Sequence, residues 1–428
     1  MGFADTSTRI DLDGLMPHEV AARLRHLPGV VFFDSAGNQP GDGGPPVSVV
    51  AARPLEVLKG SIHDAADRAR LEAVLAKRAV PTGVDLGFPA GGLCGWVDYE
   101  GGFVFGDYPE MLVHAGDGGW YEVGCLSAEL RIGPPEPAAR VGPVRARVSR
   151  ETFLDGVRRI REWIAAGDIY QVNLTQAFEA EVGEGSLWAL YGCLRELSPA
   201  PMAAWLELDG KEVLSSSPET FLRIFGRGIE TRPIKGTRPR SADAAEDRRL
   251  AVELQTSPKE IAELVMITDL LRNDLGRVCD FGSVEVREML RLETLAQVHH
   301  LVSVVGGRLR REMGQVEALA ACFPGGSITG APKKRAMEII DELEAGPRGI
   351  YCGAIGYFGY GGESQFNIAI RTMVAGDDGG WSFHVGAGIV ADSIPEREWE
   401  ETLHKAAGLL AAVGQAGRAV PVEVVGFR

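Results

Sequence analysis

The stretch from which the rest of the chain can be interpreted is FPGGSITGAPKKRAMEIIDELE, residues 323–344. Its first half is rich in glycine, and its second half has the apolar spacing of a helix that begins near Pro332. Backbone N–H groups of a glycine-rich turn before a helix can hold an anion, either a carboxylate or a phosphate. The turn is not a P-loop, because Ala331 and Pro332 follow Gly330 where Lys and Ser or Thr are required. A purely structural turn explains the same residues.

Strands and helices alternate on both sides of this stretch. The apolar pattern predicts helices over 150–166 and 257–273 before it and a helix over 395–413 after it. Neighbouring strands with helices between them are typical of an α+β fold rather than a regular βαβ array. Strands are expected over 170–179, 203–208, 212–216, 221–225, 283–290, 298–309, 353–360, 366–375 and 381–389.

The first part of the chain carries weaker signals. Residues 91–99 and 119–132 have the alternation of strands, and 133–144 is rich in Pro, Ala and Gly, which is typical of a linker. We therefore expect an N-terminal region over 1–140 and a region with the sharper motifs over 149–413, interleaved in one globular unit.

Composition and charge exclude several classes of protein. Of the 428 residues, 45% are hydrophobic and 24% are charged, an ordinary globular balance, and the formal net charge is −15. An acidic chain is a poor partner for nucleic acid or anionic lipid, so an anionic ligand would need a locally basic pocket or a metal ion. The six cysteines form no CxxC pair, and no apolar run approaches the roughly 18 residues that span a membrane. A cytoplasmic location is expected.

Two pairs of glutamates stand one helical turn apart. Glu260 and Glu263 lie near the start of one predicted helix, and Glu398 and Glu401 lie near the start of another. A spacing of three residues places both carboxylates of a pair on one helix face. If the two faces meet across a cleft, they offer the oxygen ligands that Mg²⁺ prefers. The alternative is solvated helix surface, which the helix dipole favours at these N-terminal turns.

The most basic segment is TRPIKGTRPR, residues 231–240. Two prolines and a glycine prevent a regular helix, so the segment presents its charges on a loop or a strand end. Arginines around Lys235 would disfavour the charged form of its amine, and a neutral amine is a nucleophile. A solvated basic loop is the alternative. Taken singly, His300 and Glu219 are candidate acid–base groups and Arg371 is a candidate carboxylate ligand, although each residue type is also common in structural roles.

Taken together, these motifs resemble those of the chorismate-utilising enzymes, a family that includes anthranilate synthase component I, aminodeoxychorismate synthase component I, isochorismate synthase and salicylate synthase. The resemblance runs in family order from Arg150 to the C-terminal region, and the first 150 residues resemble the weaker N-terminal region of the family. The matching stretches are IYQVNLTQ (169–176), SSSPETF (215–221), RPIKGTRPR (232–240), ELVMITDLLRNDLGRV (263–278), HHLVS (299–303), FPGGSITGAPKKRAMEIIDELE (323–344), GIYCGAIGYF (349–358), FNIAIRTM (366–373) and GAGIVADSIPEREWEETLHK (386–405).

The resemblance implies a fold of two large antiparallel β-sheets packed as a sandwich with helices outside, and Mg²⁺-dependent chemistry on chorismate. It implies that Glu263 and Glu401 hold the metal ion, with Glu260 and Glu398 beside them. The residues implied in catalysis are Lys235, Glu219 and His300, and those implied in substrate binding are Gln171, Thr237, Gly325, Gly326, Ser327, Thr329, Tyr357, Arg371, Gly386, Ala387, Gly388 and Lys405.

Two positions favour one branch of the family. Members that add water carry a lysine base where this chain has Gln171, and an amide cannot usefully accept a proton from water. Anthranilate synthases carry Ala where this chain has Lys235, whereas aminodeoxychorismate synthases typically carry Lys. In the mechanism so implied, the Lys235 amine adds at ring C2 as the C4 hydroxyl leaves, protonated by Glu219. Ammonia then adds at C4 and expels the lysine.

The implied activity is that of aminodeoxychorismate synthase component I, an early step of 4-aminobenzoate and folate synthesis. A separate glutamine amidotransferase is expected to supply the ammonia, because no cysteine lies in a Gly-x-Cys-x-Gly elbow. Two alternatives stay open: anthranilate synthase component I, and a non-catalytic tryptophan-binding subunit with the same fold. The stretch Phe32-Phe33-Asp34-Ser35 departs from the Leu-Leu-Glu-Ser signature of feedback regulation, which argues against regulation by tryptophan.

Overall fold

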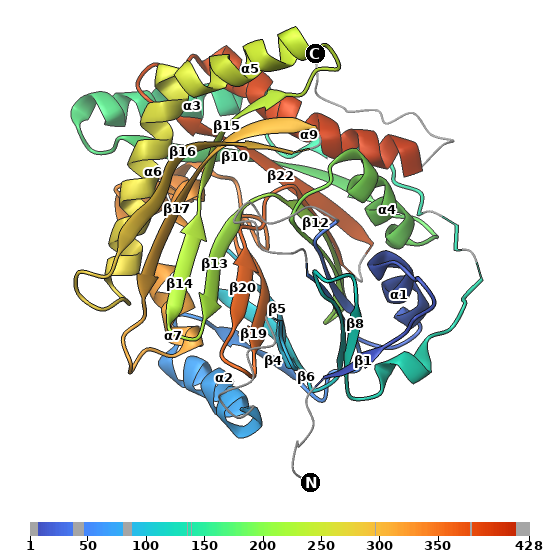
Figure 1. The fold of residues 1–428 in the computed structure, drawn as a ribbon. Coiled ribbons are helices and arrows are strands. Elements are labelled where there is room, and N and C mark those ends of the chain that lie inside the picture. The colour runs from blue at the N-terminus through green and yellow to red at the C-terminus, as the bar shows by residue number, and fades with distance from the viewer. Residues whose placement is uncertain are drawn as a thin grey trace.

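Two large antiparallel sheets lie face to face, and the helices lie outside them (Figure 1). The expected α+β sandwich is confirmed. Each sheet combines strands from the first 140 residues with strands from later in the chain. The computed structural model describes residues 7–36, 47–79, 88–134, 136–137, 139–295, 297–376 and 379–416.

The first sheet follows the order β1-β8-β7-β3-β2-β11-β12-β21-β22-β10-β18, with β9 paired to β10. Its long strands β10 and β22 pair Asn173 with Gly388 and Thr175 with Gly386. The strands are β1 (Thr8–Ile10), β2 (Val31–Asp34), β3 (Ser48–Ala51), β7 (Met111–His114), β8 (Trp120–Val123), β9 (Arg145–Ala146), β10 (Gln171–Glu181), β11 (Met202–Leu208), β12 (Lys211–Ser217), β18 (Gly330–Ala331), β21 (Thr372–Gly376) and β22 (Gly380–Ile389).

The second sheet follows the order β15-β17-β14-β13-β20-β19-β5-β6-β4, with β16 paired to β17. Strand β15 pairs with β17 so that Lys235 lies opposite Leu301 and Thr237 lies opposite His300. The strands are β4 (Val57–Ser61), β5 (Gly92–Val97), β6 (Gly102–Tyr108), β13 (Thr220–Phe225), β14 (Gly228–Arg232), β15 (Ile234–Pro239), β16 (Glu285–Thr294), β17 (Val298–Arg308), β19 (Ala354–Gly359) and β20 (Ser364–Asn367).

The helices divide between the two sheets. On the first sheet lie α1 (Pro17–Leu24), α4 (Leu187–Leu197) and α9 (Pro395–Ala416), while α3 (Arg150–Ala166) and α8 (Lys333–Leu343) pack on β10. On the second sheet lie α2 (Ala65–Arg78), α5 (Ala244–Thr256), α6 (Pro258–Gly276) and α7 (Gln315–Cys322). None of the helices in the described ranges combines the length and the apolar composition that crossing a membrane requires.

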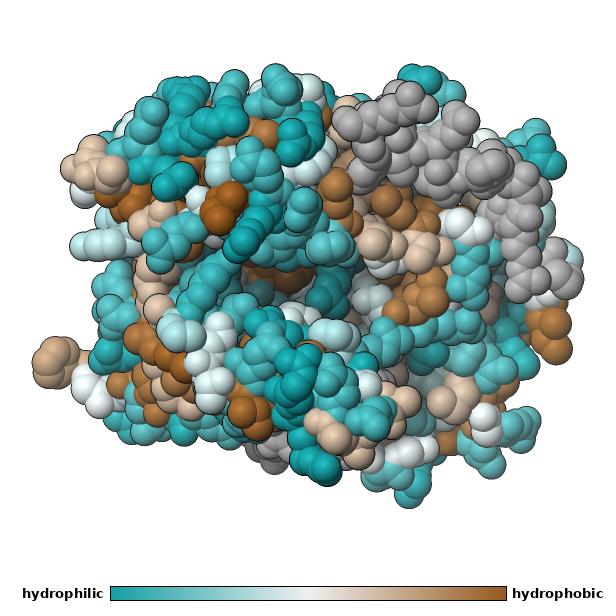
Figure 2. Space-filling model, turned by 90° about the horizontal axis from the view of Figure 1, so that it is seen from above, coloured by the Kyte–Doolittle hydropathy of each residue, from teal (hydrophilic) through white to brown (hydrophobic). Residues whose placement is uncertain are grey.

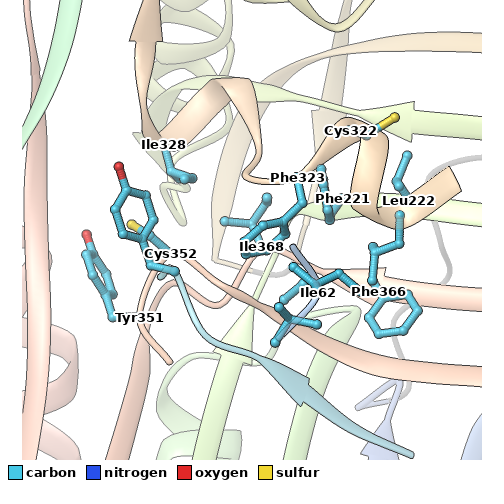
Figure 3. Close-up of a cluster of buried hydrophobic side chains, with 14 of the residues drawn as sticks. Ile62, Phe221, Leu222, Cys322, Phe323, Ile328, Tyr351, Cys352, Phe366 and Ile368 are labelled. Carbon is cyan, nitrogen blue, oxygen red and sulfur yellow. The ribbon is translucent and has the colours of Figure 1, made fainter. Parts of the chain in front are cut away.

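Apolar side chains form layers inside and outside the sandwich. Trp96 belongs to the cluster between the sheets, and Trp205 belongs to the cluster under α1, α4 and α9. A third cluster lies outside the second sheet and continues under α3 and α8. Figure 3 shows part of it, where Phe221 and Phe323 lie side by side, with ring centroids 6.2 Å apart. The glycine-rich turn, which contributes Phe323 and Ile328 to this cluster, therefore packs on buried apolar side chains.

Two expected strands are wrong. Segment 366–375 is not one strand, because β20 ends at Asn367 in the second sheet and β21 begins at Thr372 in the first. Arg371 between them has a left-handed backbone with φ 51°, where the chain crosses between the sheets. Segment 119–132 forms only the short β8, followed by a 3-10 helix over Leu126–Glu129. Apolar alternation continues through both segments, so periodicity cannot locate these breaks.

We predict that Phe366→Ala lowers the free energy of unfolding by about 3–5 kcal/mol, because it leaves a cavity in the third cluster. Phe366 is 1% exposed, and its ring centroid lies 4.7 Å from that of Phe358. Urea denaturation followed by tryptophan fluorescence measures the change. The matched control is Phe281→Ala, which removes a fully exposed ring and should change stability by less than about 0.5 kcal/mol. Equal effects of the two substitutions would contradict the packing described.

Candidate active site

The glycine-rich turn follows α7 and ends at the edge of the first sheet. Residues Gly326–Ile328 form a short 3-10 helix, η2, and Gly330 begins β18. Gly330 has φ 147°, and a side chain there would meet the Gln171 carbonyl oxygen at 2.1 Å. Only glycine permits this approach. The Thr329 hydroxyl donates to the Gly325 carbonyl at 3.1 Å, so it is engaged within the turn itself.

A buried arginine outside the predicted site holds this turn against β10. The Arg348 guanidinium donates to Ile328 O at 2.9 Å and to Asn173 O at 2.7 Å. It also binds both carboxylate oxygens of Glu344, at 2.7 and 2.8 Å. The spacing of Glu344 and Arg348, four residues apart at the end of a predicted helix, is the only sequence signal for this pair. The backbone contacts, which position the turn, leave no trace in the sequence.

Lys235 and Glu219 approach the turn from the second sheet. Lys235 Nζ donates to Ser327 O at 3.5 Å, and the Ser327 hydroxyl donates to the Glu219 carboxylate. Burial raises the pKa of Glu219 to about 7, although the Ser327 hydrogen bond and the Lys235 charge oppose this shift. A carboxyl group with this pKa can carry a proton near neutral pH and give it to a leaving group.

The arginines and the lysine of the basic segment 231–240 interact with different groups of carboxylates. Its arginines bind carboxylates: Arg238 Nε lies 2.9 Å from Glu253 on α5, and Arg240 Nε lies 2.8 Å from Asp247 on the same helix. The charge of Lys235 instead acts on the carboxylates of Glu219, Glu263 and Glu401. The expected crowding of Lys235 by arginines is therefore not what the structure shows. The irregular register at Gly236, which has φ 69°, separates Lys235 from the arginines that follow.

His300 lies on β17 with one ring nitrogen engaged and the other unpaired. Its Nδ1 lies 3.0 Å from Thr237 Oγ1 and 3.3 Å from Gly236 O. A carbonyl only accepts, so the second contact places the proton on Nδ1 and leaves a lone pair on Nε2. Nε2 is buried without a hydrogen-bond partner among the described residues. Burial and the nearby Arg371 charge lower the pKa of His300 to about 4, so the neutral ring can accept a hydrogen bond from a ligand.

Gln171 is fully buried, and neither its amide oxygen nor its amide nitrogen has a partner in the described part of the chain. A side chain at Gly388 would meet Gln171 Nε2 at 2.8 Å, so the amide lies against β22. An unpaired buried amide costs about 1–3 kcal/mol, which makes this position a good candidate for ligand binding. Gly386, Ala387 and Gly388 lie within β22, where the strand over 381–389 was expected, and Ala387 belongs to the third cluster.

Two predicted substrate ligands lie in different surroundings. Burial lowers the pKa of Arg371, and its charge acts on His300. Tyr357 belongs to the cluster between the sheets, where its ring packs against Phe33 with centroids 5.6 Å apart. It lines a small, partly open pocket, and none of the other predicted site residues lines that pocket among the residues described. The structure therefore does not place Tyr357 with the group around Lys235.

The four glutamates of the ExxE pairs lie on α6 and α9. Glu263 Oε1 and Glu398 Oε2 are buried without a hydrogen-bond partner among the described residues, and burial raises the pKa of both carboxyls. Burial also acts to raise the pKa of Glu401, but the adjacent Lys405 ammonium, 2.8 Å away, reverses the shift and the pKa is lowered. Lys405 also donates to Gly386 O at 2.8 Å. Glu260 faces Arg238 at 3.5 Å.

These carboxylates offer a suitable donor set for Mg²⁺. In the described ranges, no three His, Cys, Asp or Glu side chains are close enough as they stand to hold one metal ion. The two buried carboxylate oxygens without a hydrogen-bond partner, Glu263 Oε1 on α6 and Glu398 Oε2 on α9, are nevertheless the hard ligands that Mg²⁺ prefers. Glu263, Glu398 and Glu401 are the residues that would hold the ion.

Comparison with known proteins gives consistent matches. A family model described as "chorismate binding enzyme" matches residues 120–411. Anthranilate synthase component 1 of Geobacillus stearothermophilus is 45% identical over 284 residues, 66% of this chain and 55% of that protein. Aminodeoxychorismate synthase of Streptomyces griseus is 49% identical over 278 residues, 65% of this chain and 38% of that protein. The chain thus spans about half the length of the curated relatives it matches, or less.

Solved structures agree on the fold. Anthranilate synthase component I from Streptococcus pneumoniae TIGR4 superposes with a TM-score of 0.75 at 26% identity, covering 95% of this chain and 100% of that one. MenF, the menaquinone-specific isochorismate synthase from Escherichia coli, superposes with a TM-score of 0.77 at 19% identity, covering 95% of this chain and 94% of that one. The second likeness supports the fold alone.

We predict that Arg348→Met lowers the free energy of unfolding by about 3–5 kcal/mol, because it strands the buried Glu344 carboxylate and two backbone carbonyls. Thermal unfolding measured by differential scanning calorimetry detects the loss. Arg335→Met is the matched control, since Arg335 is partly exposed and pairs with Glu338 at the helix surface; it should change stability by about 1 kcal/mol or less. A stable Arg348→Met protein would show that the turn is held by other contacts.

Proposed function

This chain belongs to the family of chorismate-binding enzymes, and we propose that it converts chorismate and ammonia to 4-amino-4-deoxychorismate. The observation that carries the proposal is the position of Lys235, whose amine lies at the glycine-rich turn beside a buried carboxyl with a pKa of about 7. A nucleophile and a general acid thus stand next to each other. Amination through an enzyme-bound intermediate requires both a nucleophile and a general acid.

In the first step, the neutral Lys235 amine forms a bond to ring C2 of chorismate. The two ring double bonds shift, the C4–O bond breaks, and the hydroxyl leaves as water with a proton from Glu219. In the second step, ammonia forms a bond to C4, the double bonds shift back, and the C2–N bond breaks to release Lys235. The double displacement explains how the new nitrogen ends para to the ring carboxylate without an external redox partner.

The remaining residues bind and orient the substrate in this proposal. Arg371 and Lys405 supply positive charge for a carboxylate, and His300 Nε2 accepts a hydrogen bond from the ring substituents. The unpaired Gln171 amide is suited to guide ammonia, which is already a nucleophile and needs no base. Mg²⁺, held by Glu263, Glu398 and Glu401, would attract the second carboxylate and offset the acidic cluster.

The ammonia is proposed to come from a separate glutamine amidotransferase, and the product to serve 4-aminobenzoate and folate synthesis in the cytoplasm. Formation of anthranilate is the second candidate, because a relative with that activity in its name is 45% identical. Purified protein with chorismate, Mg²⁺ and ammonium distinguishes the two, since the proposed product yields 4-aminobenzoate only after a lyase is added. Fluorescent anthranilate without a lyase would overturn the proposal.

We predict that Lys235→Ala lowers the rate of 4-amination by roughly a hundredfold or more, because the covalent step loses its nucleophile. Chromatography with mass detection of the product measures the rate. In wild-type protein incubated without ammonia, a peptide containing Lys235 should gain the mass of chorismate minus water. Lys334→Ala, which changes an exposed lysine on α8, is the control and should leave the rate unchanged. A fully active Lys235→Ala protein would exclude the adduct.

We predict that kcat/KM of the wild-type protein falls as the pH rises through about 7, the raised pKa of Glu219. The protonated carboxyl is the active form of a general acid, so activity that depends on it is present below this pKa and lost above it. Glu219→Gln should lower kcat by about 10²–10⁴-fold and remove this alkaline limb. Glu151→Gln, on the exposed surface of α3, should keep the wild-type profile. An alkaline limb that persists in Glu219→Gln would assign the acid to another residue.

A further inference from the structure

A lysine that neither the motifs nor the proposed chemistry uses stands between the two glutamate pairs. Lys259 is the second residue of α6, directly after Pro258. Its Nζ lies 3.9 Å from Glu263 Oε1 and 4.0 Å from Glu398 Oε1. Its charge acts on Glu401 as well. The Lys259 ammonium therefore lies among the carboxylates that are proposed to hold Mg²⁺.

The contact joins elements that belong to different sheets. Helix α6 packs on β15, β16 and β17 of the second sheet, whereas α9 packs on β22 of the first sheet and on α3 and α4. In Figure 1, α9 runs along the top of the molecule and α6 descends from the upper left, and the ion pair between Lys259 and Glu398 joins the first turns of the two helices. Figure 2 looks down on this end and shows a largely hydrophilic surface that is hollowed near its centre. The ion pair of Lys259 with Glu398 thus spans the two halves of the sandwich.

Lys405 makes a different kind of contact with the same cluster. It pairs with Glu401, four residues before it on α9, and donates to Gly386 O on the neighbouring β22. Both partners belong to the first sheet and the helix that covers it. Removing Lys405 would therefore remove contacts within α9 and β22 only. Removing Lys259 would remove the ion pairs with Glu263 on α6 and with Glu398 on α9.

We propose that Lys259 is a tethered counter-cation that competes with Mg²⁺ for Glu263 and Glu398 and holds α6 to α9 until the ion displaces it. This inference rests on the metal role in the proposed function. The two distances, near 4 Å, describe an ion pair without a direct hydrogen bond. The Lys259 side chain is 50% exposed, so its ammonium can withdraw into solvent without crossing the core. A loosely held, half-exposed cation is one that a divalent ion can replace.

Competition makes a directional prediction for Mg²⁺ affinity. Without the ammonium, Glu263 and Glu398 retain their full attraction for a divalent ion, so Lys259→Met should bind Mg²⁺ about tenfold more tightly than wild type. Lys259→Arg keeps the charge and offers a planar fork that binds carboxylates in a bidentate manner, so it should bind Mg²⁺ a few-fold more weakly. Lys77→Met changes an exposed lysine at the end of α2, and it should bind like wild type.

Isothermal titration of the full chain with MgCl₂ alone, without chorismate, measures these affinities independently of turnover. Opposite shifts for Lys259→Met and Lys259→Arg establish the competition. Unchanged or weaker binding by Lys259→Met would overturn it, and if that variant does not fold, Lys259→Arg decides alone: binding equal to or tighter than wild type rejects the inference. Absence of Mg²⁺ binding by wild type would overturn the metal role and this inference together, whereas the lyase-dependent product assay tests the amination separately.

Discussion

The buried ion pair between Arg348 and Glu344 is the interaction on which the arrangement of the site depends. A guanidinium has five N–H donors and cannot lose its charge, so in the interior it needs several acceptors at once. Here the acceptors are one carboxylate and the backbone carbonyls of Ile328 and Asn173. The pair therefore fixes main-chain atoms of the glycine-rich turn and of β10 rather than side chains. From the other side, Lys333 binds Asp274 on α6 at 2.7 Å and ties the turn to the second sheet.

Charge balance explains how an acidic chain can maintain a receptor for an anion. The carboxylates of Glu263, Glu398 and Glu401 face the ammonium groups of Lys235, Lys259 and Lys405, which come from three different elements. Each lysine offsets part of the cost of bringing the carboxylates together in a partly buried region. A lysine ammonium becomes available to an anionic ligand only when another cation neutralises the carboxylate that it faces. Under the proposed function, metal binding and substrate binding are coupled through these lysines.

The sequence predicted the parts that depend on local rules and missed those that depend on distant contacts. Helix α3 covers Arg150–Ala166, the expected range, because Ser149 caps it and the apolar spacing is regular. The expected strand over 366–375 failed because the chain changes sheets at Arg371, a tertiary event inside an unbroken alternation. Arg348 was missed because its key acceptors, Ile328 O and Asn173 O, lie 20 and 175 residues away.

Among the site residues, the same distinction holds. The structure brings Lys235, Glu219 and Ser327 together, and it joins His300 to Thr237 and Arg371. These residues come from separate strands and from the turn, so spacing alone could not show their proximity, and the family motifs supplied it. Tyr357 shows the limit of motif transfer: its ring lies between the sheets against Phe33, although the stretch that contains it matches the family.

The position of Lys235 among carboxylates, rather than arginines, gives the proposed first step a source for its proton. The leaving C4 hydroxyl must gain a proton, and the Lys235 nitrogen must lose one after it has bonded to ring C2. The Glu219 carboxyl, which has a pKa of about 7, is protonated below this pH and can give its proton to the hydroxyl; the carboxylate so formed can then take a proton from the alkylated Lys235 nitrogen. Glu219 is thereby returned to its protonated form, and the step requires no further acid or base. If Glu263 and Glu401 held Mg²⁺, as proposed, Glu219 would be the one of these three carboxylates that remains to balance the Lys235 charge.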